Sequence, residues 1–279
     1  MSHRSAHNVE VTSTLATSAA RRGRAADRRA ILLRAVVELL IAGSVLAVYR
    51  AGRLVTNDSV STAKANAERV VAAQSWLTGT IELNVQRWML DVPGAIEALN
   101  HFYVYVHFPA TTGFLVWAFL YRRDRYAGIR NWFVGVTLAA MMIHVVFPLA
   151  PPRMLAGYVD TLREYGPRIY PEDPSRSVAN QFAAMPSLHF GWALMVALAV
   201  IALTTTRYRW WALAHPAVTL LAIVATGNHY LLDAFVAAAL ALVVGLLVVR
   251  PPCNPEVPAP AQGTCSVACG EDDPVSTIS

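Results

Sequence analysis

The chain has 279 residues, of which 55% are hydrophobic and 15% are charged, and its formal net charge is +5. This composition disfavours a soluble domain and is typical of a polytopic membrane protein. Basic and aromatic residues are not interleaved in the way that base stacking requires, so we expect no nucleic-acid partner.

Residues 1–29 form a basic N-terminal tail, with six arginines ahead of the first apolar run. A basic segment in this place is typical of a cytosolic tail that lies against anionic lipids. No small-residue cleavage site follows a short apolar core, so the segment is not predicted to be a signal peptide. We therefore predict a cytosolic tail.

Six apolar segments follow, each close to the ~20 residues that a helix needs to cross a bilayer. We predict an all-α fold in which residues 30–250 form a polytopic membrane bundle of six transmembrane helices. A more polar stretch between Thr56 and Asn100, with Trp76 and Trp88, predicts an additional amphipathic helix on the outer membrane surface. The predicted crossings are Ala30–Tyr49, Phe102–Tyr121, Trp132–Ala150, Phe190–Thr205, Trp210–Thr226 and His229–Val249.

The connections between the crossings indicate their orientation. Arginines cluster in Tyr121–Arg130 and just before Trp210, and cytosolic connections carry such an excess of positive charge. These connections and both chain ends are therefore predicted to be cytoplasmic. The long connections Arg50–His101 and Pro151–Leu188 are predicted to lie outside.

Residues 251–279 are predicted to form a disordered cytosolic tail, because they are rich in proline and end with acidic residues. All three cysteines of the chain lie in this tail. An odd number of cysteines without paired CxxC spacing indicates no disulfide framework and is only a weak signal for a metal site.

His229 and Asp233 are four residues apart in GNHYLLDAF, where a polar turn meets an apolar run. This spacing places both side chains on one face of a predicted helix, about one turn apart. The carboxylate can hold one imidazole nitrogen and leave the other free to act as a base or nucleophile. The pair is the first candidate catalytic element.

Two further motifs reach the same predicted membrane face. His189 opens an apolar segment in MPSLHFGW, after Ser187, a favoured N-cap residue at a helix end that would favour a bound anion. Arg153 follows two prolines in APPR and can present a rigid fork to a phosphate. The convergence of these motifs with His229 predicts an active site at the outer face.

Three functions fit these residues. The first is a membrane enzyme that acts on a lipid phosphate or phosphodiester. The second is a zinc-dependent membrane hydrolase with His189, His229 and Asp233 as ligands, a set without the base found in motifs such as H-E-x-x-H. The third is a proton-coupled transporter, a class that usually places such groups near the midplane of repeated segments. We favour the enzyme, and we expect no metal and no cofactor.

The motifs APPR, MPSLHFGWA and GNHYLLDA, in this order, resemble the three signature motifs of the type 2 phosphatidic acid phosphatase superfamily. Within it, the chain resembles the branch that contains the inositol phosphorylceramide synthases, over roughly Phe102 to Val249. The resemblance implies a metal-independent lipid phosphatase or phosphotransferase that works through a phosphohistidine. It implies His229 as the nucleophile, Asp233 as its orienter and His189 as the acid that protonates the leaving oxygen.

By the same resemblance, Arg153 and the region of Ser187 hold the phosphoryl oxygens. The chain departs from the phosphatase pattern at four positions, where it has Val146, Met154, Leu188 and Ile223. Two of these residues, Val146 and Ile223, stand where the pattern has a cation. Other residues must therefore neutralise the phosphate, and the departures favour transfer over hydrolysis.

Several other side chains are candidates for substrate binding. His107 and His144 fall in the outer halves of the second and third predicted crossings, where histidines also serve as interhelical hydrogen-bonding groups. Asn228 and Tyr230 flank His229, although turn-forming Asn and interfacial Tyr are common in such places. Arginines of the outer segments are further candidates to neutralise the phosphate, namely Arg87, Arg163, Arg168 and Arg176.

Together these observations predict a multi-pass protein of the cell membrane with an active site on the outer face. Polyprenyl phosphates, phosphatidic acid-like lipids and inositol-phosphate acceptors all fit an apolar groove that ends in an anion site. The expected partners are thus membrane lipids and a lipid phosphate or phosphodiester substrate.

Overall fold

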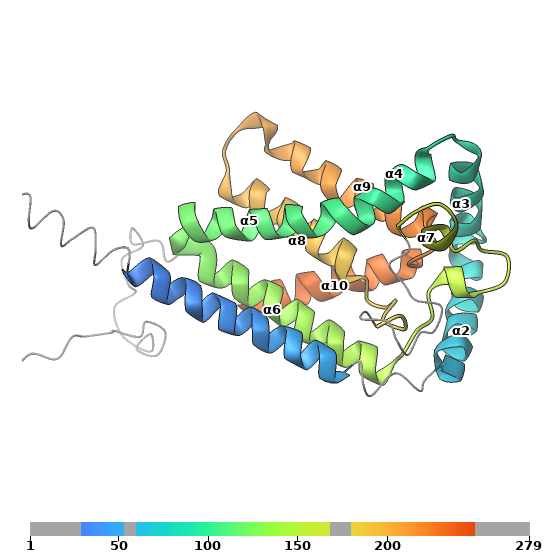
Figure 1. The fold of residues 1–279 in the computed structure, drawn as a ribbon, viewed down its shortest axis with the longest axis horizontal. Helices are drawn as coiled ribbons and strands as arrows, with labels where there is room; N and C mark the ends of the chain where they lie inside the picture. The colour runs from blue at the N-terminus through green and yellow to red at the C-terminus, as the bar shows by residue number, and fades with distance from the viewer. Residues whose placement is uncertain (1–28, 53–59, 168–179, 249–279) are drawn as a thin grey trace, which may run out of the picture. The chain divides into compact units, whose positions relative to one another are not determined.

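Helices make up most of the chain in the computed structural model, which describes residues 29–52, 60–167 and 180–248 (Figure 1). These residues contain no strand, only an isolated β-bridge between Leu149 and Ala183, so the predicted all-α class is confirmed for them. The predicted tails lie almost wholly outside the described residues. The helices are Arg29–Gly52, α2 (Val60–Thr78), α3 (Ile81–Asp91), α4 (Ala95–His101), η1 (Phe102–Val106), α5 (His107–Tyr121), α6 (Arg123–Val146), η2 (Pro152–Met154), α7 (Thr161–Glu164), α8 (Leu188–Leu203), η4 (Arg207–Leu213), α9 (Ala214–Ala225) and α10 (Leu231–Val248).

Four of the described helices are long and apolar enough to cross a membrane: Arg29–Gly52, Ala95–Tyr121, Arg123–Val146 and Leu231–Val248. They correspond to the first, second, third and sixth predicted crossings. The fourth corresponds to α8, which is apolar but has only 16 residues. The fifth is divided, because its first part is the 3₁₀ segment η4 and only the 12 residues of α9 are α-helical.

The third predicted crossing begins earlier than expected. The arginine-rich stretch after Tyr121 is not a loop, because α5 ends at Tyr121 and α6 begins at Arg123. Arg122 lies between them and donates a hydrogen bond of 2.5 Å to the carbonyl oxygen of Leu203, at the end of α8. The same helix ends at Val146, before Pro148, whose ring cannot continue it.

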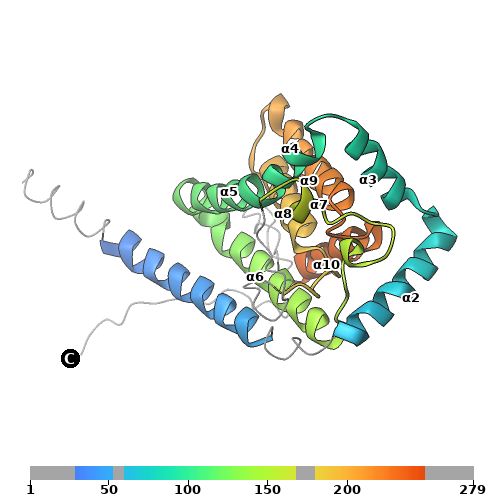
Figure 2. The same ribbon diagram turned by 45° about the vertical axis from the view of Figure 1, so that its right-hand side comes forward.

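The helices α5, α6, α8 and α10 run alongside one another, and α2 and α3 lie across one end of them (Figure 1). Figure 2, turned by 45°, shows α2 and α3 at that end, one after the other with a bend between them. The last helix packs against α6 and α8, and α8 packs against α9. Between α6 and α10, the Trp132 indole donates a hydrogen bond of 2.7 Å to the carbonyl oxygen of Ala241. Segments distant in sequence therefore pack against one another within the bundle.

The first helix, Arg29–Gly52, is joined to α6 by polar contacts. Glu38 accepts hydrogen bonds from Arg130 at 2.8 Å and from the Tyr126 hydroxyl at 3.0 Å. Apolar side chains such as Leu39, which is 72% exposed, cover much of the remaining helix surface, as suits contact with lipid.

Candidate active site

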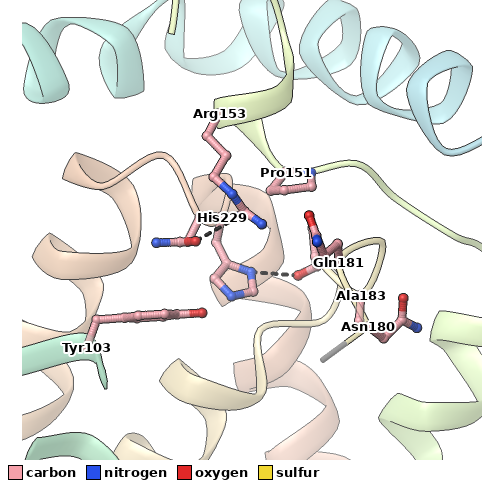
Figure 3. Close-up of a pocket in the computed structure, with 9 residues that line it drawn as sticks. Tyr103, Pro151, Arg153, Asn180, Gln181, Ala183 and His229 are labelled. Atoms are coloured by element: carbon pink, nitrogen blue, oxygen red, sulfur yellow. Dashed lines mark hydrogen bonds between the residues drawn. The ribbon is translucent and has the colours of Figure 1, made fainter. Parts of the chain in front are cut away.

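A pocket with about 240 Å³ of empty volume lies where the three sequence motifs meet (Figure 3). Arg153 comes from the first motif, Ala184 borders the second and His229 belongs to the third. The pocket lies where the chain segments between helices converge, so loops supply most of its walls. Its lining residues are Tyr103, Pro151, Arg153, Asn180, Gln181, Ala183, Ala184, Asn228 and His229.

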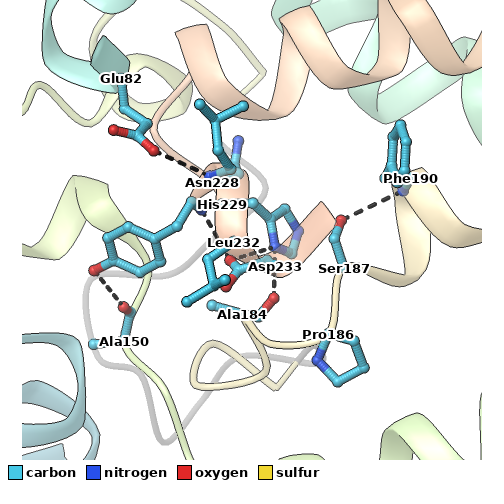
Figure 4. Close-up of polar contacts among 12 residues, drawn as sticks. Glu82, Ala150, Ala184, Pro186, Ser187, Phe190, Asn228, His229, Leu232 and Asp233 are labelled. Carbon is cyan, nitrogen blue, oxygen red and sulfur yellow. Dashed lines mark hydrogen bonds and ion pairs between the residues drawn. The ribbon is translucent and has the colours of Figure 1, made fainter. Parts of the chain in front are cut away.

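The His229 imidazole is held from one side through its Nδ1 atom. Nδ1 lies 2.7 Å from the carbonyl oxygen of Ala184 and 3.3 Å from the Oδ2 atom of Asp233 (Figure 4). A carbonyl oxygen only accepts hydrogen bonds, so Nδ1 carries a proton and donates it. In the neutral ring the Nε2 atom then has the lone pair, which is the state that a nucleophile needs.

Asp233 is fully buried in the first turn of α10. Its Oδ2 atom accepts a hydrogen bond of 2.9 Å from the backbone N–H of Tyr230, and its Oδ1 atom has no hydrogen-bond partner among the described residues. The carboxylate therefore caps its own helix and contacts the imidazole at the same time. A carboxylate beside a positively charged imidazolium would stabilise that charge.

The His229–Asp233 pair does not lie on a helix face as the sequence suggested. The helix begins at Leu231, and His229 lies in the turn before it. Gly227 makes this turn with a φ of 68°, and a Cβ there would lie 3.4 Å from the backbone nitrogen of Arg153. Glycine is the residue that adopts this conformation at little cost. The side chains still meet, because Asp233 reaches back from the first turn of the helix.

His189 lies in the first turn of α8, beside the nucleophile candidate. Its ring centroid is 6.0 Å from that of His229, and it stacks on Tyr103 with a centroid distance of 4.2 Å. The Nε2 atom of His189 has no hydrogen-bond partner within the described part of the chain. Ser187 is the N-cap of α8, as predicted, and accepts a 3.4 Å hydrogen bond from the backbone N–H of Phe190.

Among the described residues that line the pocket, Arg153 is the only Lys or Arg, and it is 8% exposed. It lies in η2, where its backbone N–H donates to the carbonyl oxygen of Gly227 at 2.8 Å. Its guanidinium donates to the Oδ1 atom of Asn228 at 2.8 Å and lies 3.8 Å from Asp160. Asn228 and Asp160 thus fix the plane of the guanidinium at the edge of the pocket.

The other predicted substrate-binding residues are not among those that line the pocket. His107 is fully buried among aromatic rings, and neither of its ring nitrogens has a hydrogen-bond partner among the described residues. His144 makes a 3.1 Å hydrogen bond to the carbonyl oxygen of Pro186. The hydroxyl of Tyr230 donates to the carbonyl oxygen of Ala150 at 3.0 Å, away from the pocket. These contacts, like the cap of Ser187, support the segments that carry the site.

The structure also brings residues to the pocket that the motifs did not indicate. Tyr103 comes from η1, a π-helical turn, and such turns occur frequently at functional sites. Figure 3 shows Tyr103 on one side of the His229 ring and Gln181 on the other. The backbone N–H of Asn180 donates to the Tyr49 hydroxyl at 2.7 Å, so the first helix holds this wall. The only signal for Asn180 and Gln181 was their position just before the MPSLHF motif.

The positions where the phosphatase pattern has cations are not part of the pocket. Val146 ends α6 with 77% of its surface exposed, and Ile223 is fully buried in a hydrophobic cluster. Arg163 lies in α7, and Arg168 falls outside the described residues, as does Arg176.

In the loop after Arg153, burial and then the charge of Glu82 raise the pKa of the Tyr158 phenol, which stays protonated.

Comparison with known proteins agrees with this chemistry. Residues 68–247, more than half of the chain, match the PAP2 superfamily. The chain therefore belongs to the PAP2 superfamily, whose members are generally phosphatases and phosphotransferases. No curated protein and no solved structure matches the chain. The predicted superfamily is thus confirmed, and the narrower branch stays a prediction.

The zinc alternative requires His189, His229 and Asp233 to share one ion. The described residues contain no group of three or more His, Cys, Asp or Glu side chains that could hold a metal ion. The Nδ1 atom of His229, which is nearest to Asp233, already donates to the Ala184 carbonyl. Only the Nε2 atom of His229 is then left to bind a metal ion, whereas Asp233 contacts Nδ1.

Proposed function

We propose that this protein is a membrane lipid phosphatase or phosphotransferase that forms a phosphohistidine on His229. One observation carries the proposal: Nδ1 of His229 is held by Ala184 and Asp233, while the ring lines a pocket that also contains Arg153. A nucleophile, a cation and a second imidazole are the groups that phosphoryl transfer needs.

In the first step, the lone pair on Nε2 of His229 attacks phosphorus, and the bond between phosphorus and the leaving oxygen breaks. His189 gives its proton to that oxygen. The proton on Nδ1 of His229 stays in place, so the ring becomes positively charged. The Ala184 carbonyl and the Asp233 carboxylate stabilise this charge, and Arg153 stabilises the charge on the phosphoryl oxygens.

In the second step, the oxygen of water or of an alcohol attacks the same phosphorus atom. His189, now neutral, takes the proton of the attacking hydroxyl. The bond between phosphorus and Nε2 breaks, and its electron pair returns to His229. Hydrolysis and transfer therefore use the same protein groups and differ only in the acceptor. Metal independence follows from this scheme, because Arg153 and the imidazoles carry out every step.

The charge of the pocket favours a phosphodiester donor and transfer to an alcohol, as in the inositol phosphorylceramide synthase-like branch. Arg153 is accompanied in the pocket by the neutral amides of Asn180, Gln181 and Asn228. Because Arg153 already lies 3.8 Å from the Asp160 carboxylate, it balances the single negative charge of a phosphodiester better than the nearly double charge of a phosphomonoester. The apolar residues Val146 and Ile223, at the positions where the phosphatase pattern has cations, fit the same preference for a singly charged phosphodiester.

The pocket is also small for a whole lipid. Its empty volume of about 240 Å³ includes space that is open to solvent, so the enclosed cavity is smaller still. We propose that it takes the phosphoryl group alone. The apolar tails of the substrate would then remain among the exposed apolar side chains of the helices, in lipid.

We propose further that the chain crosses the membrane six times and has the pocket at the outer face. The 16 residues of α8 span about 24 Å, and local thinning of the bilayer accommodates such short crossings. Trp76 in α2 is 86% exposed and Trp88 in α3 is 62% exposed, as suits two helices that lie in the membrane–water interface. Residues 1–29 and 251–279 would be cytosolic.

The test is turnover by purified protein in detergent on a panel of lipid phosphomonoesters and phosphodiesters, with and without alcohol acceptors. Released phosphate and newly formed lipid are measured separately. We expect His229→Ala and His189→Ala to abolish turnover. Full activity of His229→Ala on every substrate would disprove the proposal.

The same assay tests the expected absence of a metal. Turnover should be unchanged after dialysis against a strong chelator, because no step uses a metal ion. Loss of turnover on chelation, with recovery on addition of zinc, would favour the zinc-dependent hydrolase instead.

A further inference from the structure

The first turn of α10 is held by side chains from a distant part of the chain. The first backbone N–H groups of a helix have no partner within the helix. The N–H of Leu231 donates to the Oε1 atom of Glu82 at 3.1 Å, and the N–H of Leu232 donates to the Oε1 atom of Gln74 at 3.3 Å. Figure 4 shows Glu82 reaching toward this turn from α3.

Glu82 in α3 and Gln74 in α2 form a connected pair. The Gln74 amide donates to the Oε1 atom of Glu82, the same oxygen that accepts from Leu231. Glu82 is 2% exposed and Gln74 is 5% exposed. A buried carboxylate is costly unless it is hydrogen-bonded, and the N-terminus of a helix is a place that favours negative charge. The start of α10 therefore stabilises the buried pair, because its backbone N–H groups bond both side chains.

This turn also sets the geometry of the candidate nucleophile. Asp233, in the turn, contacts Nδ1 of His229 and accepts from the N–H of Tyr230. The Asp233 carbonyl oxygen accepts from the backbone N–H of Ser187 at 3.1 Å. A displacement of the turn would move Asp233 and His229 relative to the loop that carries the Ala184 carbonyl.

The bonds of Glu82 and Gln74 complete the set of contacts at the start of the helix. Asp233 satisfies the N–H of Tyr230, Glu82 that of Leu231 and Gln74 that of Leu232. The helix end therefore has no N–H left in these three positions for a substrate phosphate. The helix end therefore contributes to the site by placing side chains. The groups that remain to bind the phosphoryl oxygens are Arg153 and the side-chain amides of the pocket.

We propose that Glu82, supported by Gln74, is a positioning residue for catalysis, which fixes the first turn of α10 and through it the reach of His229 into the pocket. The inference rests on the proposed phosphohistidine function. Neither Glu82 nor Gln74 lines the pocket, so substrate binding should not depend on them.

The test compares kcat, KM and thermal stability for four variants of the full-length protein in detergent. Glu82→Ala removes the acceptor and should lower kcat about 100-fold with KM within 3-fold, since a misplacement of about 1 Å can have such an effect. Glu82→Gln keeps an acceptor oxygen and should restore kcat to within about 5-fold of wild type. Gln74→Ala should have an intermediate effect.

The fourth variant, Asn66→Ala, is the matched control. Asn66 is a buried amide in α2, the helix that carries Gln74, and its Nδ2 atom donates to the carbonyl oxygen of Pro148 at 2.9 Å rather than to α10. It should lower the melting temperature as Gln74→Ala does but leave kcat near wild type. If kcat fell equally in Asn66→Ala and Gln74→Ala at equal loss of stability, the inference would be overturned.

A fifth variant keeps the test decisive if Glu82→Ala does not fold. Glu82→Asp keeps the charge but is one methylene shorter, so it should lower kcat at least 10-fold and leave KM unchanged. Wild-type kcat in a folded Glu82→Asp or Glu82→Ala protein would refute the positioning role. The proposed function fails separately: it fails when His229→Ala is active, whatever Glu82 does.

Discussion

The imidazole of His229 is closer to a backbone carbonyl than to its acidic partner. Its Nδ1 atom lies 2.7 Å from the oxygen of Ala184 and 3.3 Å from the Oδ2 atom of Asp233. Because a carbonyl oxygen cannot donate, Ala184 alone is sufficient to keep the proton on Nδ1. The tautomer and the charge stabilisation are therefore divided between two groups.

Asp233→Asn should lower kcat less than the same substitution does in a catalytic triad, where the aspartate is the only group that orients the histidine. We expect kcat to fall about 10- to 100-fold, against the ~10⁴-fold loss seen when an asparagine allows the wrong tautomer in a catalytic triad. The amide oxygen of the substituted side chain can still accept from the N–H of Tyr230, so the turn should keep its shape. A kcat as low as that of His229→Ala would show that the Ala184 carbonyl does not hold the tautomer.

Arg153 should not be replaceable by lysine. Its guanidinium bonds Asn228 and approaches Asp160 with different nitrogens, a geometry that a single ammonium group cannot reproduce. We expect Arg153→Ala to lower kcat/KM by about 10²–10³, the usual loss for one donor that stabilises a transition state, and Arg153→Lys to recover only part of it. Steady-state kinetics on one lipid substrate measure both, and unchanged kcat/KM in Arg153→Ala would remove Arg153 from the site.

His107→Phe should leave both stability and activity largely intact. The imidazole is fully buried, and its two ring nitrogens have no hydrogen-bond partner in the described part of the chain. An unsatisfied buried polar group costs about 1–3 kcal/mol of stability. Phenylalanine has no polar ring atom, so His107→Phe should raise the melting temperature or leave it unchanged. The control is His144→Phe, which loses the bond to the Pro186 carbonyl and should lower it. A large fall in kcat/KM for His107→Phe would instead place His107 in contact with the substrate.

The proposed topology predicts which thiols are accessible in intact cells. The natural cysteines, Cys253, Cys265 and Cys269, should react with a membrane-impermeant maleimide only after the cells are permeabilised. With these three replaced by serine, Trp76→Cys should react in intact cells, because Trp76 is 86% exposed on α2, which is proposed to lie outside. Labelling in the opposite pattern would place the pocket on the cytosolic side.

The sequence was informative where function depends on side chains at short spacing. The four-residue separation of His229 and Asp233 predicted their contact, and Ser187 was recognised as a helix cap. The apolar runs predicted the four long helices, since composition and length determine whether a helix can cross a bilayer. It was less informative at α9, because η4 interrupts the regular helix without interrupting the apolar run.

Other features leave little trace in a sequence. The Ala184 carbonyl is a backbone group that every residue has, so no side-chain pattern identifies it as the partner of His229. Glu82 is 149 residues from Leu231, and only folding brings them together. Long-range contacts of this kind depend on packing of the whole bundle, which periodicity and local spacing do not encode.

The most direct measurement of the central proposal is to trap the phosphorylated protein. Labelled substrate is mixed with enzyme, the reaction is stopped in alkali on the millisecond scale, and the modified residue is located by mass spectrometry. We predict an acid-labile phosphoryl group on the imidazole of His229, which keeps its second ester substituent when the substrate is a phosphodiester and disappears when water or an alcohol acceptor completes turnover. Turnover with the phosphoryl group on another residue, or in a His229→Ala protein, would contradict it.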